Sequence, residues 1–408
     1  MKARNDEKMA PETGGVLFDR PLEWFHHKSL PKWGYEKEQT DTFALLHPKC
    51  EEPGKAYPLY VVFHSAGHDV YSAVGCTWLP GNHDIYHTPD DMFGLYLDCR
   101  QHTGDWWWGG NSAVDIIDAK REGVEKQPVE NRVIATIEWV IEQYSIDTER
   151  VYAVGNSMGG SGALGIAMCR GDLFAAVKVN VPAGVRHMAA RCCLDRELPE
   201  GFAIPDPPVL VDYSAQDDVW STGHQVLYRG MKDKKYALMG YFGEFGHCNN
   251  DSEIHKVNDL VHSFDIFDIR LSDPYPVFTY AQTDDQIPWA DDGTIVHHDA
   301  GQVNAFFRWS DFKESETSLS LSLRLLAQDE WASRVTFPES SKTDISFRRL
   351  KTCKFVSGDK VAWEFGEESG TSVADENGLV TIHGITVEKA QKVLKVYKIE
   401  ENKKIGVK

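Results

Sequence analysis

The chain has 408 residues, of which 42% are hydrophobic and 11% aromatic, and this predicts a globular protein with a sizeable core and two domains. Its formal net charge of −19 argues against nucleic acid and anionic membranes as partners, because neither attracts so acidic a surface. The sequence contains no apolar stretch of the length that a bilayer-spanning helix needs.

The N-terminal residues and the cysteines bear on the compartment. The first residues contain no apolar segment, so we expect no signal peptide in this chain. The 8 cysteines have no repeated spacing and no Cys-x-x-Cys pair, which favours reduced thiols without disulfides. We therefore expect a cytoplasmic protein, or a secreted or periplasmic one if a signal peptide has been removed.

The first part of the chain predicts a surface arm followed by the first strands of a sheet. Residues 1–40 are polar, with interspersed Pro, Gly and Trp, and are expected to form an arm on the main domain. Apolar runs predict strands over 42–46, 59–64 and 93–98. The segment 82–91 mixes His and Asp without a known ligand spacing, so we interpret it as a polar surface loop and expect neither metal nor cofactor.

Apolar strands then alternate with amphipathic helices. Apolar side chains recur at helical spacing over 131–144, and a strand over 151–154 and a helix over 159–169 follow. Further strands are predicted over 175–179, 208–213 and 236–242, and further helices over 223–232 and 253–264. Because strands that are apolar on both faces indicate a parallel sheet covered on two sides, we expect residues 41–272 to form one α/β domain.

The pattern changes after residue 273. Leucines alternate with polar residues over 318–326, which is the period of a half-buried antiparallel strand. Further short strands are predicted over 334–337, 344–350, 360–365, 379–385 and 393–399. Short strands separated by turn residues are typical of a β-sandwich, which we expect for residues 273–408.

The run Gly-Asn-Ser-Met-Gly-Gly at 155–160 lies between the predicted strand and helix. A Gly-x-Ser-x-Gly turn in this setting resembles the nucleophile elbow of α/β-hydrolases. Glycines leave room for a strained turn that lifts the serine hydroxyl clear of the sheet. Ser157 is therefore the candidate nucleophile.

Two later loops carry the groups that would activate such a serine. Asp217 and Asp218 follow the strand 208–213, where an acid that orients a histidine belongs. We favour Asp217, because Asp218 leads away into the next segment. His247 lies on a glycine-flanked loop after the strand that follows. The chain order serine, acid, histidine matches that of α/β-hydrolases, so a triad of Ser157, Asp217 and His247 is expected.

Backbone amides would stabilise the oxyanion that forms during acyl transfer. The amide of Met158 follows the nucleophile directly. A second amide is expected from the loop after the strand 59–64. The resemblance to α/β-hydrolases implies a glycine in this loop in many of them, where this chain has Ser65. The sequence leaves open whether Ser65 or Ala66 supplies it.

Tryptophans are the candidate substrate-binding residues. The run 105–110 reads Asp-Trp-Trp-Trp-Gly-Gly and follows a strand that ends near the edge of the sheet where the triad is expected. Exposed indoles offer flat amphipathic surfaces to sugars or aromatic acids, whereas buried ones would only fill the core. We expect Trp107 and Trp108, together with Trp220 beyond the acid loop, to contact substrate.

These motifs make the region of residues 40–270 resemble the branch of the α/β-hydrolases that contains feruloyl esterases, acetylxylan esterases and polyhydroxybutyrate depolymerases. The resemblance rests on residues 147–160, on 64–67, and on the Asp217 and His247 loops. It implies acyl transfer to Ser157 and an acylated plant cell-wall carbohydrate or small ester as substrate. The C-terminal region resembles accessory sandwich domains of polysaccharide-active enzymes.

Two other functions stay open. A serine peptidase of the prolyl-oligopeptidase type shares the triad order, although its β region usually precedes the hydrolase domain. A carbohydrate-binding protein built on a hydrolase scaffold is the second alternative, against which the apparently intact Ser157, Asp217 and His247 argue. The oligomeric state does not follow from the sequence.

Overall fold

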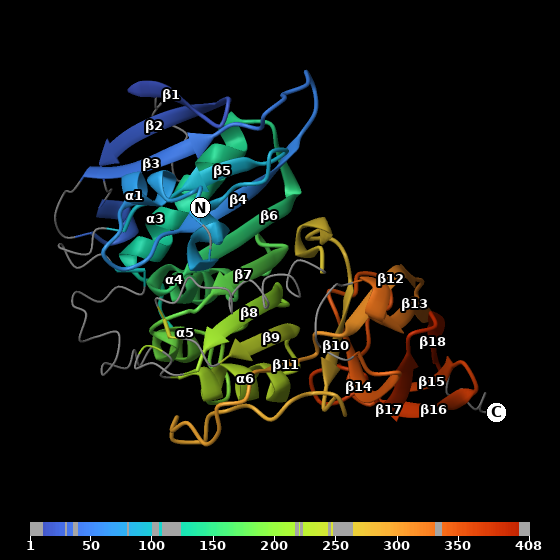
Figure 1. Ribbon diagram of the computed structural model, residues 1–408. Helices are drawn as coiled ribbons and strands as arrows, with labels where there is room; N and C mark the ends of the chain where they lie inside the picture. Colours follow the sequence, from blue (N-terminus) through green and yellow to red (C-terminus); the bar gives the residue numbers. More distant parts are fainter. Residues whose placement is uncertain are drawn as a thin grey trace.

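The computed structural model describes residues 11–28, 31–35, 40–79, 81–99, 106–107, 124–216, 220, 223–243, 246–247, 264–330 and 337–399. Figure 1 shows two bodies, a large sheet with helices in blue to green and a smaller body of strands in orange and red. Within these ranges, none of the helices is both long and apolar enough to cross a bilayer.

The large sheet is mostly parallel. Across the sheet its described strands are β1 (Thr13–Leu17), β2 (Arg20–Lys28), β3 (Thr40–Leu46), β5 (Phe93–Tyr96), β4 (Tyr57–Phe63), β6 (Ile146–Asn156), β7 (Ala176–Asn180), β8 (Val209–Ala215), β9 (Leu238–Gly243) and β11 (Gly301–Val303). The strands from β5 to β9 pair in parallel. The strands β1, β2, β3 and β11 add antiparallel pairings at the two edges. The predicted parallel sheet is confirmed.

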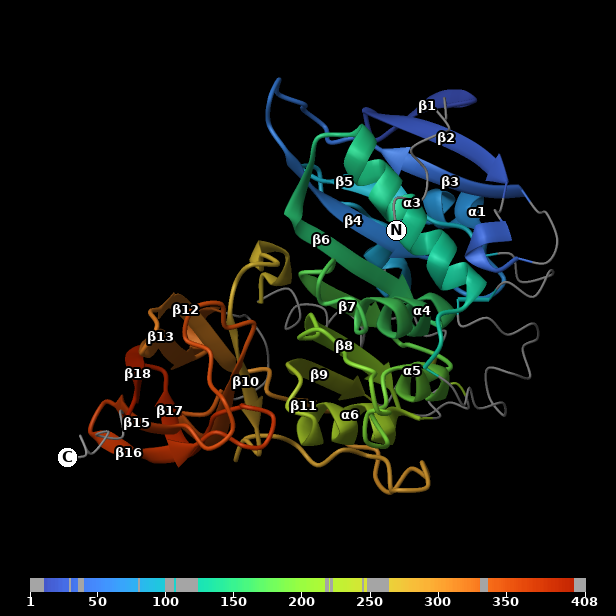
Figure 2. The ribbon, with the colours of Figure 1, turned by 180° about the vertical axis from the view of Figure 1, so that it is seen from behind.

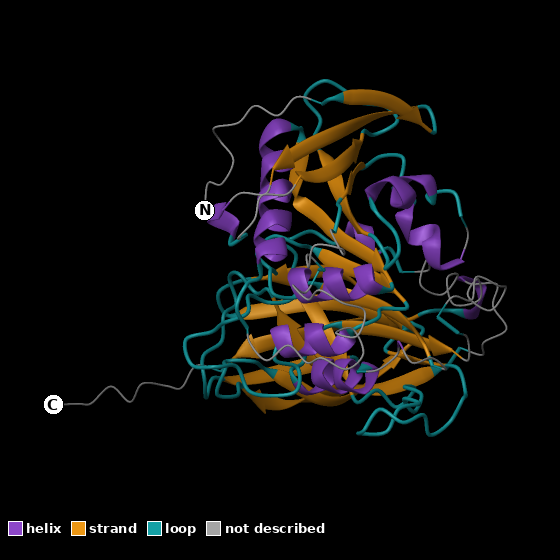
Figure 3. Ribbon diagram, turned by 90° about the vertical axis from the view of Figure 1, so that its left-hand side faces the viewer, coloured by secondary structure: helices purple, strands orange, loops and turns teal. Residues whose placement is uncertain are grey.

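Apolar side chains cover both faces of this sheet. One face carries α3 (Pro128–Gln143), α4 (Met158–Ala167), α5 (Val185–Arg191) and α6 (His224–Asp233) (Figure 2). Leu59, Val61 and Phe63 of β4 share a core with these helices. Tyr60 and Val62 point the other way, into a core with α1 (Val70–Gly75) and the C-terminal strands. Figure 3 shows the helices against the strands from the side. Burial on both faces explains the uninterrupted apolar strand sequences.

The described residues of the C-terminal body form two antiparallel sheets. One contains β10 (Tyr275–Thr279), β14 (Ser340–Arg348) and β17 (Thr381–Glu388), and the other β12 (Phe307–Glu314), β13 (Ser318–Leu325), β18 (Lys392–Lys398), β15 (Lys360–Phe365) and β16 (Glu368–Val373). The leucines of β13 are buried in one core with Ile345 and Ile382 of the other sheet. The alternation over 318–326 thus marks a half-buried strand. An α/β body is followed by an antiparallel β body, as predicted.

Some segments differ from the sequence prediction. Residues 13–28, predicted as part of a surface arm, form the hairpin β1–β2 at the sheet edge, and the buried side chains of Leu22 and Phe25 anchor it. After β10 the chain returns to the large sheet as β11. The predicted helix over 253–264 and strand over 334–337 fall almost entirely outside the described residues.

Close packing of α4 on β4 gives a stability prediction. A Cβ atom at Gly159 would lie 2.0 Å from the carbonyl oxygen of Phe63, and this contact involves backbone that cannot rotate away. We expect Gly159→Ala to lower the free energy of unfolding by roughly 3 kcal/mol, measured by urea denaturation. Gly165→Ala is the matched control in the same helix.

Gly165 has room for a Cβ atom, whereas Gly159 does not. The nearest atom to a Cβ at Gly165 is 3.8 Å away, so alanine there is expected to be neutral or to stabilise the helix by about 0.5–1 kcal/mol. Equal stabilities of the two variants would contradict the close approach of α4 to β4.

Candidate active site

Ser157 lies in a strained turn between β6 and α4. Its backbone φ is 57° and ψ is −123°, a region that residues other than glycine rarely adopt. The turn requires glycine on both sides, since a Cβ at Gly155 would lie 2.2 Å from the Gly159 carbonyl oxygen. The Ser157 N–H donates to the Asn180 carbonyl oxygen at 2.9 Å, which ties the turn to the end of β7. The local geometry is that of a nucleophile elbow.

The structure brings His247 against Ser157. The Ser157 Oγ and His247 Nε2 atoms are 2.6 Å apart, within the hydrogen-bond reach that a general base needs. Burial lowers the pKa of His247 to about 4, so its ring is neutral at pH 7. In the tautomer with a proton on Nδ1, its Nε2 accepts the Ser157 proton. Two of the three predicted triad members thus meet across the ends of β6 and β9.

The candidate acids, Asp217 and Asp218, lie outside the described residues. The strand β8, which precedes them, ends at Ala215, and the Gln216 N–H donates to the Gly243 carbonyl oxygen at 3.1 Å. The chain therefore leaves β8 beside the end of β9, and His247 follows β9. The described Asp212 accepts hydrogen bonds from Ser214 and Tyr228 inside β8 and is not among the residues that line the Ser157 pocket.

The two oxyanion alternatives differ in their hydrogen bonds. The Ser65 N–H donates to the Tyr86 hydroxyl at 2.8 Å, and the Ser65 hydroxyl donates to the Asn156 carbonyl oxygen at 3.2 Å. Ser65 therefore holds the loop in place, and its amide already has a partner. Ala66 is the better candidate for the second donor. Met158 is the first residue of α4, where backbone N–H groups have no acceptor within the helix.

A pocket of about 300 Å³ opens at Ser157. It is lined by Ser65, Ala66, His68, Asn82, His83, Asn156, Ser157, Met158, Ala183, Trp220 and His247. We predicted that residues 82–91 form a polar surface loop. This is wrong for the first part of the segment, because Asn82 is only 2% exposed and Tyr86 is buried. The rings of His68 and His83 stack at 5.4 Å, and burial lowers the pKa of both. These loops form one wall of the pocket.

The three predicted tryptophans have different outcomes. Trp220 lines the pocket, with its ring centroid 6.2 Å from that of His247. Trp107 does not line the pocket, contrary to the prediction, because its side chain is packed in the core. Its indole is 2% exposed, donates to the His64 carbonyl oxygen at 3.0 Å and fills the space beside Gly162. Trp108 lies outside the described residues.

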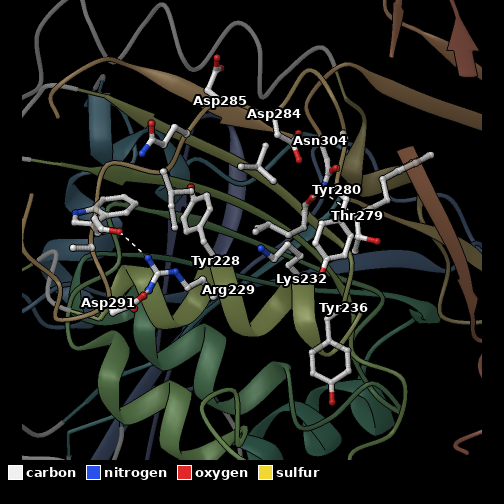
Figure 4. A pocket seen from close by; sticks show the side chains of 18 of the residues that line it. Tyr228, Arg229, Lys232, Tyr236, Thr279, Tyr280, Asp284, Asp285, Asp291 and Asn304 are labelled. Atoms are coloured by element: carbon white, nitrogen blue, oxygen red, sulfur yellow. Dashed lines mark hydrogen bonds and ion pairs between the residues drawn. The ribbon is translucent and has the colours of Figure 1, made fainter. Parts of the chain in front are cut away.

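A second, larger cavity of about 700 Å³ lies between α6 and the segment 278–304. Figure 4 shows its lining, in which Arg229 pairs with Asp291 at one end and Lys232 lies beside Tyr280 at the other. Its lining residues do not include Ser157 or His247. Among the described residues, its lining contains neither a serine nor a histidine, so it lacks the pair of side chains that the smaller pocket holds.

Fold and site together define the class of protein. The sheet order, the elbow between β6 and α4, and the following β domain are those of an α/β-hydrolase with a C-terminal β domain. The contact between Ser157 and His247 is the arrangement of a serine hydrolase.

Known proteins are similar to parts of this chain. The model of the prolyl oligopeptidase family matches residues 120–190, which include the elbow. No curated protein matches the sequence. An S-formylglutathione hydrolase from Agrobacterium tumefaciens is similar over 59% of this chain and 92% of its own, with 14% identity and a TM-score of 0.42. A putative dipeptidyl aminopeptidase IV from Bacteroides ovatus is similar over 60% and 35%, with 15% identity and a TM-score of 0.41. A ferulic acid esterase is similar over 57% and 93%, with 13% identity and a TM-score of 0.39.

The burial of His247 predicts the pH dependence of any reaction in which it acts as the base. Only the neutral ring accepts a proton, and burial lowers its pKa to about 4. We therefore expect kcat/KM to rise with pH through about 4 and to be level by pH 6.5, the ordinary pKa of histidine. The profile is measured with an ester whose spontaneous hydrolysis is subtracted, and circular dichroism at each pH excludes unfolding. A midpoint near 6.5 would contradict the effect of burial.

Proposed function

We propose that the protein is a serine carboxylic-ester hydrolase that works through Ser157, His247 and Asp217. The observation that carries this proposal is the 2.6 Å contact between the Ser157 hydroxyl and a neutral His247 ring at the floor of a pocket. A serine hydroxyl is a weak nucleophile unless a base accepts its proton as it attacks. Here the base and the strained elbow occur together.

The reaction has two halves. The Ser157 oxygen attacks the ester carbonyl while His247 takes the hydroxyl proton, and the amides of Met158 and Ala66 donate to the oxyanion. His247 then gives that proton to the leaving alcohol, which forms the acyl-enzyme. A water molecule, deprotonated by His247, attacks the acyl group and releases the acid, and the proton returns to Ser157. Asp217 orients the imidazole and stabilises its charged form.

The proposed substrates are acetyl or feruloyl esters of plant cell-wall carbohydrate. The pocket of about 300 Å³ suits a short acyl chain or a single aromatic ring. Trp220 on its wall offers an indole face against which a sugar or a hydroxycinnamate could stack. A peptidase is the second candidate, because the family model that matches the elbow segment is that of the prolyl oligopeptidases.

A substrate panel tests the proposal. The purified protein is assayed on p-nitrophenyl acetate, methyl ferulate, acetylated xylan and a prolyl anilide, with organophosphonate-treated protein as the control. We expect turnover of at least one ester, abolished by the treatment. Turnover of none of the esters would contradict the esterase, and turnover of the anilide alone would favour the peptidase. The relative turnover of methyl ferulate and acetylated xylan shows whether the enzyme prefers a feruloyl or an acetyl group.

A further inference from the structure

A closed ring of hydrogen bonds joins the nucleophile to its base through two asparagines. The Ser157 N–H donates to the Asn180 carbonyl oxygen at 2.9 Å, and the Asn180 side-chain amide donates to the Asn82 carbonyl oxygen at 3.1 Å. The Asn82 side-chain amide donates to the His247 carbonyl oxygen at 2.6 Å. The contact of the His247 imidazole with the Ser157 hydroxyl closes this circle of hydrogen bonds.

Further contacts hold the ring rigid. The Asn82 side-chain oxygen accepts from the Tyr213 hydroxyl at 3.0 Å, which orients the amide so that its NH₂ group faces His247. The Asn180 side chain also donates to an Asp84 carboxylate oxygen at 2.9 Å. Asn82, Asn180 and Tyr213 are all buried, where hydrogen bonds are electrostatically stronger than in water. Asn82 lies in a short helix (Gly81–Tyr86), and contacts from β7 and β8 hold its carbonyl oxygen and its side chain.

The chemistry of position 82 suits an asparagine. Its amide donates to one partner and accepts from another at the same time. An ionised carboxylate at this position could accept from Tyr213 but would repel the His247 carbonyl oxygen. The residue is separated from His247 by 165 positions in the chain, and it still contacts the backbone of the candidate base.

From this ring we propose that Asn82 is a positioning residue, which holds the His247 backbone so that its ring stays within proton-transfer distance of Ser157. The inference rests on the proposed roles of Ser157 and His247. Misplacing a reacting group by about 1 Å can cost roughly 100-fold in rate. Loss of the Asn82 contact is therefore expected to slow proton transfer while leaving the pocket able to bind substrate.

The first test uses a fluorophosphonate probe, because its reaction with Ser157 needs the Ser–His pair whatever the natural substrate is. We expect Asn82→Ala to react roughly 10- to 100-fold more slowly than the natural protein. Tyr60→Phe is the matched control, since the Tyr60 hydroxyl donates to the Ile85 carbonyl oxygen of the same short helix at 2.7 Å but stands outside the ring. The control is expected to react at the natural rate within about threefold.

Ester kinetics then separate positioning from a general loss of structure. A p-nitrophenolate group leaves without a proton, whereas an ethanol group must receive one from His247. We expect Asn82→Ala to lower kcat/KM about tenfold more for ethyl acetate than for p-nitrophenyl acetate, with KM little changed. Thermal melting checks that both variants are folded. An unchanged ratio, or an equal shift in Tyr60→Phe, would overturn the proposal.

A second variant covers the case in which alanine at position 82 does not fold. Asn82→Asp keeps the size and the acceptor for Tyr213 but loses the donor when ionised. We expect its probe reactivity, relative to the natural protein, to recover as the pH falls and the carboxyl group gains a proton that it can donate. A constant ratio over pH would overturn the proposal. A protein that reacts with the probe but hydrolyses no ester would contradict the proposed function alone.

Discussion

Ser157→Ala is expected to lower kcat for ester hydrolysis by about 10⁴-fold or more, with KM and thermal stability nearly unchanged. The hydroxyl oxygen is the atom that forms the acyl bond in the proposed reaction, and alanine has no atom that could take its place. The amides of Met158 and Ala66, the proposed oxyanion donors, remain, so a residual rate above that of water is expected. Initial rates on p-nitrophenyl acetate and labelling by a fluorophosphonate measure the loss.

Ser161→Ala is the matched control for this prediction. Ser161 lies one turn further along α4 and is also buried, but it is not among the residues that line the pocket. Its replacement should leave both the turnover and the labelling at the natural level. Equal ester turnover by Ser157→Ala and the natural protein would exclude Ser157 as the nucleophile.

The parallel sheet follows from the sequence because its strands are buried on both faces. Runs such as that of β4 read as uninterrupted apolar segments, and the leucines of β13 alternate because only one face is buried. The hairpin β1–β2 was not predictable in the same way. Its first strand, β1, is largely exposed at the sheet edge, so its sequence carries no apolar period. Pairing with β2, which in turn pairs with β3, is what makes it a strand.

The two halves of the site differ in how far the sequence reveals them. Ser157 and His247 each follow a strong strand signal, and the ends of parallel strands meet at one edge of the sheet. Asn82 and His83 lie in a short helical segment whose burial depends on contacts with β7, β8 and the His247 loop. Such contacts between distant segments leave no local period in the sequence. Trp107 shows the converse case, since the slot beside Gly162 that buries it exists only once α4 packs against the sheet.

The second large effect is expected from the acid loop. We predict that Asp217→Asn lowers kcat by about 10⁴-fold, because the amide can neither stabilise the imidazolium nor favour the tautomer in which Nε2 accepts the Ser157 proton. Asp218→Asn is the matched control, with the same change of charge one residue later, and its kcat is expected to stay within about threefold of the natural value. Steady-state rates on one ester, with melting temperatures for both variants, measure the difference.

The pattern of losses in the two variants tests which residue of this loop, if either, is the acid. A large loss in Asp218→Asn alone would make Asp218 the partner of His247, and small losses in both variants would remove the acid from this loop. The pH dependence of kcat/KM gives an independent test of which residue is the acid. A carboxylate beside His247 favours the charged ring and raises its pKa, so removal of the true acid should move the acid limb of kcat/KM to lower pH.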